Sequence, residues 1–289
     1  MARITTVSVL GAGVLGSQIA FQAAYHGFEV TSYDISDKAV QAADSRLKAI
    51  MQAVRAQLPG ATDEEITAAR GRITHTTELA EAAKADLVIE AVPENLELKQ
   101  GVYTELGGLA PESTIFATNS STLLPSDIAA STGRPDRFLA LHFANQVWIR
   151  NTAEVMGTEQ TDPAVYDAVV EFAGAIGMVP IQLHKEQPGY VLNSLLVPLL
   201  GAAAELLMRG VATPEDIDNT WRIATGAPNG PFEIYDVVGL RTPYEINKAG
   251  DEGNRLFAQY LKENYLDKGK LGMESGEGFY KYDERGKRI

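Results

Sequence analysis

The stretch SVLGAGVLGSQIAFQAAYHGFEVTSYD, residues 8 to 34, places three closely spaced glycines between an apolar run and a helical pattern. Gly11 is expected to permit a tight turn, Gly13 to let a pyrophosphate approach the backbone, and Gly16 to bring the helix against the strand. Free backbone N–H groups at the start of that helix would face the phosphates. The stretch therefore predicts a strand–turn–helix unit that binds a dinucleotide.

Asp34 ends the second strand-like run of this unit, FEVTSYD. A carboxylate about 20 residues after such glycines accepts hydrogen bonds from the adenosine ribose, and its charge repels a 2′-phosphate. We therefore predict NAD as the cofactor, in preference to NADP. An ordinary βαβ unit with an incidental Asp34 is the alternative. The cofactor-binding residues expected in this unit are Gly11, Gly13, Val14, Leu15, Gly16 and Asp34.

Strand-like and helical segments alternate through about residue 185, which is typical of a parallel sheet covered by helices on both faces. A long helical insertion is expected over residues 36–71, interrupted by LPGATDEE. After KEQPGY only helical patterns remain. The sequence thus predicts an α/β fold: a Rossmann-type doubly wound sheet over residues 1–186, followed by an all-helical domain over residues 187–289. Further strands are expected at 72–76, 85–92, 113–119, 138–143, 152–157 and 178–184.

Composition limits the chemistry and the partners. The 289 residues include no cysteine, which excludes disulfides, thiolate catalysis and Cys-ligated metals and fits a cytoplasmic protein. The net charge of -13 argues against nucleic acid, whose phosphates it would repel. No apolar run near 18 residues is evident, so no membrane span is expected. No metal-ligand cluster is evident either, and the expected partner is a small-molecule substrate.

Four histidines are candidates for acid–base chemistry. His26 falls in the last turn of a helix, where its charge would suit the helix dipole, and His75 and His184 are interpreted as structural or surface residues. His142 ends the apolar strand LALH on the carboxyl side of the sheet, where doubly wound folds bind ligands. Glu154 lies in the apolar run TAEVMG, where a carboxylate is costly to bury without a partner. Either the two side chains pair across neighbouring strands, or Glu154 is solvated on an edge strand.

A series of motifs runs in order over nearly the whole chain: GAGVLG, IEAVPENLELK, FATNSSTL, LHFANQ, AEV, PGYVLN, GAPNGPFEIYDVVGL and GEGFYKY. Together they resemble the short-chain L-3-hydroxyacyl-CoA dehydrogenase family, which includes 3-hydroxybutyryl-CoA dehydrogenases. The resemblance implies a Rossmann-type NAD domain and a helical C-terminal domain that dimerises. It also implies hydride transfer between NAD and a 3-hydroxyacyl-CoA or its 3-oxo form.

The same resemblance implies roles for individual residues. His142 matches the catalytic acid–base histidine, and Glu154 matches the acid that pairs with it. Ser121 and Asn193 match residues that contact the reacting oxygen, so both are expected in catalysis and in substrate binding. The remaining matches are Asn145 as a further active-site asparagine, Glu94 and Lys99 beside the nicotinamide half of the cofactor, and Asn119 in the cofactor site.

The sequence departs from the family pattern directly after His142. The family usually continues HFFNPV, whereas this chain reads HFANQV, with Ala144 in place of a Phe and Gln146 in place of a Pro. Arg150 would bind a substrate carboxylate if it faces the pocket, and solvent exposure is the alternative. In other members the long helix after the second strand carries lysines near the CoA nucleotide, whereas here its stretch SRLKAIMQAVRAQ keeps only Arg46, Lys48 and Arg55 as basic residues.

Three functions therefore stay open. The leading one is an NAD-dependent 3-hydroxyacyl-CoA dehydrogenase. The second is the same chemistry on a free 3-hydroxy acid, a 3-oxo ester or a small ketone. The third is a non-catalytic dinucleotide-binding protein, which the joint presence of the four matched catalytic residues disfavours. The run LLVPLLGAAAELL is apolar on more than one face and needs burial beyond a single contact. The resemblance points to a second copy in a homodimer, and complete burial within the chain is the alternative.

Overall fold

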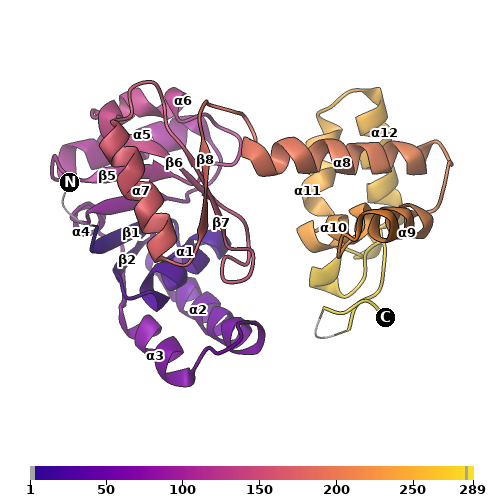
Figure 1. Ribbon diagram of the computed structural model, residues 1–289, viewed down its shortest axis with the longest axis horizontal. Helices are drawn as coiled ribbons and strands as arrows, with labels where there is room; N and C mark the ends of the chain where they lie inside the picture. The colour runs from indigo at the N-terminus through magenta and orange to yellow at the C-terminus, as the bar shows by residue number, and fades with distance from the viewer. Residues whose placement is uncertain (1–3, 284–285) are drawn as a thin grey trace. The chain divides into compact units, whose positions relative to one another are not determined.

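The computed structural model describes residues 4–283 and 286–289, and within them eight strands form one sheet in the order β3-β2-β1-β4-β5-β6-β7-β8 (Figure 1). Neighbouring strands run parallel except β6 and β7, which are antiparallel. The predicted doubly wound sheet is confirmed. The strands are β1 (Thr6–Leu10), β2 (Glu29–Tyr33), β3 (Ile73–Thr76), β4 (Leu87–Glu90), β5 (Ile115–Thr118), β6 (Phe138–Phe143), β7 (Thr152–Met156) and β8 (Val179–Leu183).

Helices cover both faces of this sheet, which explains why its central strands are apolar throughout rather than alternating. In β4, Leu87 and Ile89 belong to the core on one face, and Val88 to the core on the other. The first face is covered by α1 (Val14–Tyr25), α2 (Asp37–Gln57), α3 (Asp63–Gly71) and α7 (Pro163–Ala175). The second is covered by α4 (Leu79–Ala82), α5 (Leu96–Leu109) and α6 (Ser126–Ala129), with the short turns η1 (Ala130–Thr132) and η2 (Pro135–Arg137) nearby in the chain.

The helical insertion after β2 has the interruption expected at LPGATDEE. Helix α2 ends at Gln57, and α3 begins at Asp63 behind the N-cap residue Thr62. The Thr62 hydroxyl accepts from the Glu65 amide, and the Glu65 carboxylate accepts from the Thr62 amide. This reciprocal capping box satisfies amides that a helix start otherwise leaves unpaired.

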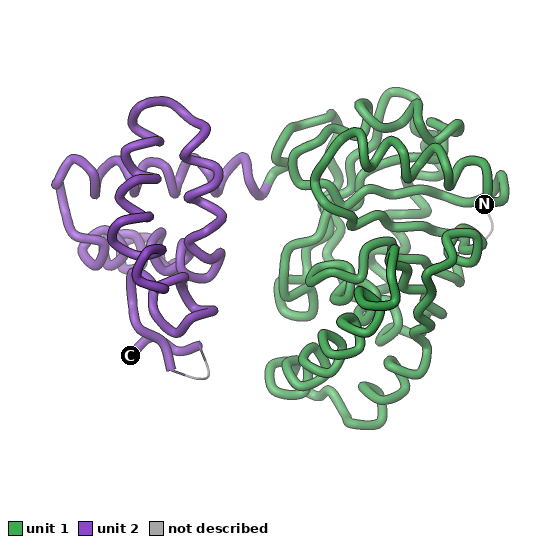
Figure 2. Tube along the Cα trace, turned by 180° about the vertical axis from the view of Figure 1, so that it is seen from behind, with its two compact units in different colours: residues 1–191 green, residues 192–289 purple. Residues whose placement is uncertain are grey.

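The chain divides into two compact units, Met1–Val191 and Leu192–Ile289 (Figure 2). The second unit is helical, as expected, around a core that includes Phe232, Tyr235 and Phe257. Its elements are α8 (Tyr190–Met208), which starts in the first unit, α9 (Pro214–Thr225), α10 (Pro231–Val238), α11 (Arg241–Lys248) and α12 (Glu252–Asn264), with the turns η3 (Leu266–Lys268) and η4 (Met273–Ser275).

Helix α8 corrects one expectation from the sequence. Its 19 residues have a mean hydropathy of 1.8 in the most apolar window, so by length and composition alone the helix is apolar enough to cross a membrane. The expectation that no such segment exists is therefore wrong. A single helix of this kind is weak evidence for a span, because the core helix of a soluble protein passes the same test.

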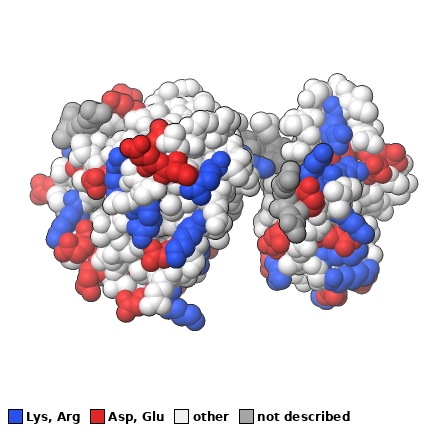
Figure 3. Space-filling view, turned by 90° about the horizontal axis from the view of Figure 1, so that it is seen from below, with Lys and Arg blue, Asp and Glu red and all other residues white. Residues whose placement is uncertain are grey.

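Charged side chains of both signs are interspersed on the face of each unit that Figure 3 shows. The acidic balance of the chain therefore does not appear there as a face of one sign. An anionic ligand must consequently be held by local groups, such as backbone N–H donors, rather than attracted by the overall field.

Candidate active site

The glycine loop between β1 and α1 meets the steric requirements of a dinucleotide-binding turn. Gly11 has a φ of +94°, and a Cβ built there would lie 2.6 Å from the Ala91 carbonyl oxygen. A Cβ on Gly16 would lie 1.9 Å from the carbonyl oxygen of Gly11, so only glycine lets α1 pack this close. A Cβ on Gly13 would meet nothing within 4 Å. The loop thus has no space for a side chain at Gly11 or Gly16, but it leaves space at Gly13, where α1 begins.

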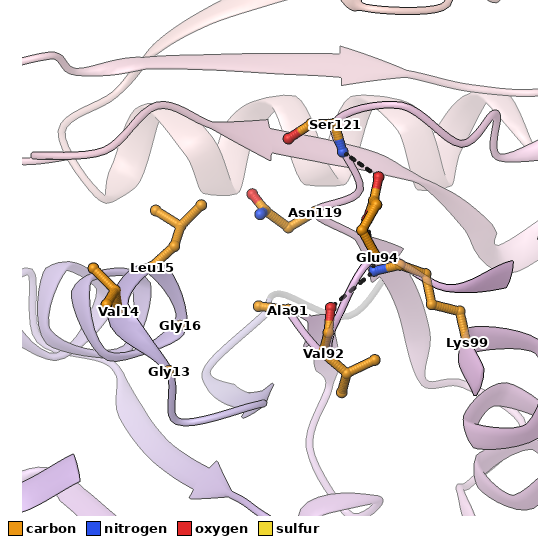
Figure 4. A pocket seen from close by; sticks show the side chains of 10 residues that line it. All are labelled: Gly13, Val14, Leu15, Gly16, Ala91, Val92, Glu94, Lys99, Asn119 and Ser121. Carbon is orange, nitrogen blue, oxygen red and sulfur yellow. Dashed lines mark hydrogen bonds and ion pairs between the residues drawn. The ribbon is translucent and has the colours of Figure 1, made fainter. Parts of the chain in front are cut away.

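A cavity of about 290 Å³ opens beside this loop (Figure 4). It lies where β1 and β4 are neighbours although their helices leave in different directions, which is the usual ligand position in a doubly wound sheet. Most of the residues assigned to the cofactor from the sequence therefore meet at one place. The lining residues are Gly13, Val14, Leu15, Gly16, Ala91, Val92, Glu94, Lys99, Asn119 and Ser121.

Asp34, just beyond the end of β2, is fixed against the glycine loop. Its carboxylate accepts from the amide of Ala12 at 2.9 Å and from the amide of Ile35 at 2.8 Å. A carboxylate has about four acceptor positions, so positions remain for the two hydroxyls of a ribose. The residues present therefore fit the adenosine half of NAD.

Lys99 reaches the cavity from α5, but its ammonium is held by two carboxylates. Its Nζ lies 2.6 Å from Glu90 and 3.3 Å from Glu94, and the side chain is only 1 % exposed. Burial raises the pKa of the Glu90 carboxyl, and the charge and hydrogen bond of Lys99 offset part of that rise. Sequence reasoning missed Glu90, although it used the same signal, a carboxylate in an apolar run, to find Glu154.

Glu94 organises the loop that follows β5. Its Oε1 accepts from the hydroxyls of Ser120 and Thr122 and from the amides of Ser121 and Thr122, at 2.5 to 3.0 Å. Burial acts to raise the pKa of Glu94, but these hydrogen bonds and the charge of Lys99 outweigh it and lower the pKa to about 2. A fixed negative charge thus holds Ser121 in place beside the cavity.

His142 and Glu154 occupy directly opposite positions on the antiparallel strands β6 and β7. His142 Nδ1 lies 2.9 Å from Glu154 Oε2, and both side chains are 5 % exposed. Because a carboxylate only accepts, this contact assigns a proton to Nδ1 and leaves Nε2 free to exchange one. Nε2 lies 3.1 Å from the Ser121 hydroxyl. Of the two arrangements that the sequence allowed, the structure has the buried pair.

Tyr190 completes this site and was missed from the sequence. Its ring stacks on the imidazole of His142, with centroids 4.4 Å apart and planes 13° apart. Its hydroxyl donates to the Ser120 carbonyl at 2.7 Å, and the amide of Val191 donates to Glu154 Oε1 at 2.9 Å. The motif PGYVLN drew attention to Asn193 instead, because no local pattern reveals which distant ring a tyrosine will cover.

The other predicted site residues have different surroundings. Asn119 lines the cavity and accepts from the Phe143 amide at 2.9 Å. Asn145 is exposed, 3.5 Å from the Gln18 amide, and Arg150 is exposed in the loop before β7. Asn193 lies on α8 within the second unit, so its contact with a reacting oxygen stays a prediction.

The remaining histidines lie elsewhere. His26 is the residue after α1, and burial lowers its pKa, so the positive charge suggested for it at the helix end is disfavoured. His75 lies 3.6 Å from Asp44, and His184 is exposed. Among residues 4–283 and 286–289, no three His, Asp or Glu side chains are grouped to hold a metal ion.

Two family models match consecutive parts of the chain: the NAD-binding domain of 3-hydroxyacyl-CoA dehydrogenase over residues 6–187, and its C-terminal domain over residues 189–282. The rat mitochondrial hydroxyacyl-coenzyme A dehydrogenase is 38% identical over 288 residues, covering 96% of this chain and 91% of the relative. The probable 3-hydroxybutyryl-CoA dehydrogenase of Bacillus subtilis is 35% identical over 286 residues, covering 98% and 99%.

Two solved structures are also similar over nearly their full length. The (S)-3-hydroxybutyryl-CoA dehydrogenase of Ralstonia eutropha is 31% identical, with a TM-score of 0.81 and coverage of 97% of this chain and 100% of that one. A diketoreductase described as acting on dicarbonyl compounds is 64% identical, with a TM-score of 0.94 and coverage of 98% and 100%. The chain belongs to the 3-hydroxyacyl-CoA dehydrogenase family and is an NAD-dependent oxidoreductase.

Proposed function

We propose that this oxidoreductase interconverts a ketone and an alcohol in small 3-oxo or dicarbonyl compounds that carry no CoA. The observation that carries the proposal is the 64% identity to a diketoreductase, against 38% or less for the CoA dehydrogenases compared above. From the sequence alone, a CoA thioester is the leading substrate and a CoA-free compound is the second. The comparison favours the CoA-free compound over the CoA thioester, with the same hydride transfer to or from NAD.

The basic residues of α2 support this order. Arg46 donates to the Ala12 carbonyl at 2.8 Å, and Arg55 pairs with Asp63 at 2.5 Å. The helix has four basic residues, and the other two, Lys38 and Lys48, are exposed. Both arginines of this helix are thus engaged within the protein, which leaves only the two lysines for a nucleotide carrying several phosphates.

The loop after His142 also supports a CoA-free substrate. Gln146 has a φ of +64°, whereas a proline ring fixes φ near −65°, so the family's proline does not fit this backbone. The Gln146 amide donates to Gln18 at 2.6 Å, and the buried Trp148 donates to Gln57 at 2.9 Å. Contacts to α1 and α2 thus hold the loop in a path that differs from the family pattern, next to the smaller Ala144.

The chemistry follows from the pair of side chains. NAD, when bound in the cavity, supplies the hydride or accepts it. His142 Nε2 gives a proton to the forming alkoxide in reduction and takes it back in oxidation. Glu154 holds Nδ1–H and stabilises the imidazolium, while Ser121 offers a hydroxyl within reach of the same oxygen.

The test compares kcat/KM with NADH for acetoacetyl-CoA, acetoacetate and ethyl acetoacetate. We expect the ester to be reduced with an efficiency comparable to that of the thioester. A preference for acetoacetyl-CoA above about 10⁴ exceeds what a few hydrogen bonds of ~1 to 1.5 kcal/mol each supply, and would reject the proposal.

The same series with Arg150→Met separates two kinds of CoA-free substrate. If Arg150 binds a carboxylate, acetoacetate alone loses efficiency, and the natural substrate is a free acid. If all three compounds keep their efficiencies, Arg150 is solvent-exposed in function as well, and neutral 3-oxo compounds remain the proposed class.

A further inference from the structure

We propose that Tyr190 is a positioning residue for the acid–base pair, holding the His142 ring and favouring its protonated form. The inference rests on the proposed role of His142. Tyr190 is 1 % exposed and lies flat against the imidazole, at 4.4 Å and 13°. In this arrangement the imidazole cannot tilt toward Tyr190 without overlap, so the direction of Nε2 is restricted.

The hydroxyl of Tyr190 extends the restraint to the other side of the site. It donates to the carbonyl of Ser120 at 2.7 Å, and the next residue, Ser121, places its hydroxyl 3.1 Å from His142 Nε2. Burial raises the pKa of the Tyr190 hydroxyl, which keeps it a donor at neutral pH. One side chain therefore positions both the imidazole and the loop that carries Ser121.

The backbone at Tyr190 provides independent support. Its φ is +54°, a conformation that is unfavourable for a bulky side chain, and it directly follows Gly189 with a φ of +78°. Such a conformation persists where the surroundings hold it in place, and it occurs often at functional sites. Here the adjoining amide of Val191 donates to Glu154 Oε1, so the same turn also fixes the acid.

The stacked ring has an electrostatic consequence. The π-face of an aromatic ring is negative and attracts a cation placed over it, more strongly in a dry site. In reduction, His142 is cationic before it gives its proton to the substrate and neutral afterwards, so Tyr190 stabilises the form that donates. The charged groups around the two rings are Glu154 at the imidazole and Glu94, Glu90 and Glu186 toward the tyrosine. They are unchanged by a substitution at Tyr190.

The experiment compares Tyr190→Leu, which removes the ring, with Tyr190→Phe, which keeps the ring and removes only the hydroxyl. In the reductive direction we expect Leu to lower kcat about 5- to 30-fold, the range of a stacked or cation–π contact. We also expect it to move the basic limb of the kcat profile to lower pH, with the KM for NADH nearly unchanged. Phe should keep the position of that limb.

Phe172→Leu is the matched control, because Phe172 is a buried aromatic of the same unit that packs edge-on against Phe28. It should lower Tm without moving the pH profile. If Tyr190→Leu does not fold, Tyr190→Met fills the space instead. A Tyr190 variant that loses Tm like the control but keeps kcat and the profile overturns the inference. Full turnover by His142→Ala would instead reject the proposed function on which it rests.

Discussion

At the scale of single residues, the carboxylates of this site differ in what they hold. Glu154 holds a histidine, Glu90 neutralises a buried lysine, and Glu94 gathers the hydroxyls and amides of one loop. The sequence identified Glu154 and Glu94 but not Glu90. The partner of a buried carboxylate depends on which strands become neighbours, and periodicity alone does not reveal that pairing.

The low pKa of Glu94 predicts a pH-dependent contribution to stability. Its pKa in the folded protein, about 2, lies below the ordinary value of 4.5. The ionised side chain therefore contributes stability that is present above pH 4.5 and is lost as pH falls toward 2. We expect Glu94→Gln to lower Tm near pH 6, with the difference from wild type shrinking between pH 4.5 and 2.

Thermal unfolding followed by circular dichroism between pH 2 and 7 measures this. Glu97→Gln, an exposed carboxylate in the first turn of the same helix α5, controls for the loss of one charge. A Tm difference for Glu94→Gln that stays constant over the whole range would contradict the assignment.

At the scale of elements, the β1–α1–β2 unit was predictable almost completely, because Gly11 and Gly16 each meet a local steric requirement and Gly13 leaves the loop open beside the cavity. The loop from Ala144 to Asn151 was not. The hydrogen bonds of Gln146 to Gln18 and of Trp148 to Gln57 join segments far apart in the sequence. The sequence marked this loop only as a departure from a family pattern.

Two glycine substitutions separate packing from binding in this unit. Gly16→Ala puts a Cβ 1.9 Å from a backbone oxygen and should lower Tm markedly. Gly13→Ala meets no protein atom within 4 Å, and its φ of −68° suits alanine, so Tm should change little. Because Gly13 faces the cavity, NADH affinity measured by fluorescence titration should fall instead. Equal losses of Tm in both variants would refute this division.

The end of β2 sets the choice between cofactors. The Asp34 carboxylate is held at the glycine loop, so a 2′-phosphate placed there meets its negative charge. We expect kcat/KM for NADH to exceed that for NADPH by at least about 30-fold, corresponding to ~2 kcal/mol. Steady-state kinetics with both cofactors provides the measurement. Equal values of kcat/KM with NADH and NADPH would mean that Asp34 does not discriminate between a ribose hydroxyl and a 2′-phosphate.

At the scale of the whole molecule, α8 exposes large apolar side chains, among them Leu195 at 70% and Val197 at 52%. Several large apolar side chains exposed along one helix are costly in water and mark an interaction surface. The family resemblance implies a helical domain that dimerises, and we propose a second copy of the chain as the partner. Sedimentation equilibrium at micromolar concentration should give twice the chain mass.

Leu195→Asp should shift that equilibrium to monomer while circular dichroism stays unchanged, because burying the new carboxylate against a second copy is unfavourable. A wild-type protein that sediments only as a monomer at micromolar concentration would refute the dimer. The sequence pointed to this helix through its apolar run, but it did not reveal which side chains remain exposed.

We propose that the His142–Glu154 pair serves the reduction of a CoA-free dicarbonyl compound by NADH. The most direct measurement is the rate of NADH oxidation with 2,4-pentanedione, for wild type and for His142→Ala. We expect saturable turnover by wild type and a loss of about 10² to 10⁴ in the variant, the range for a general acid, with NADH affinity retained. If wild type oxidises NADH with acetoacetyl-CoA but with no dicarbonyl compound lacking CoA, or if His142→Ala turns over normally, the account is contradicted.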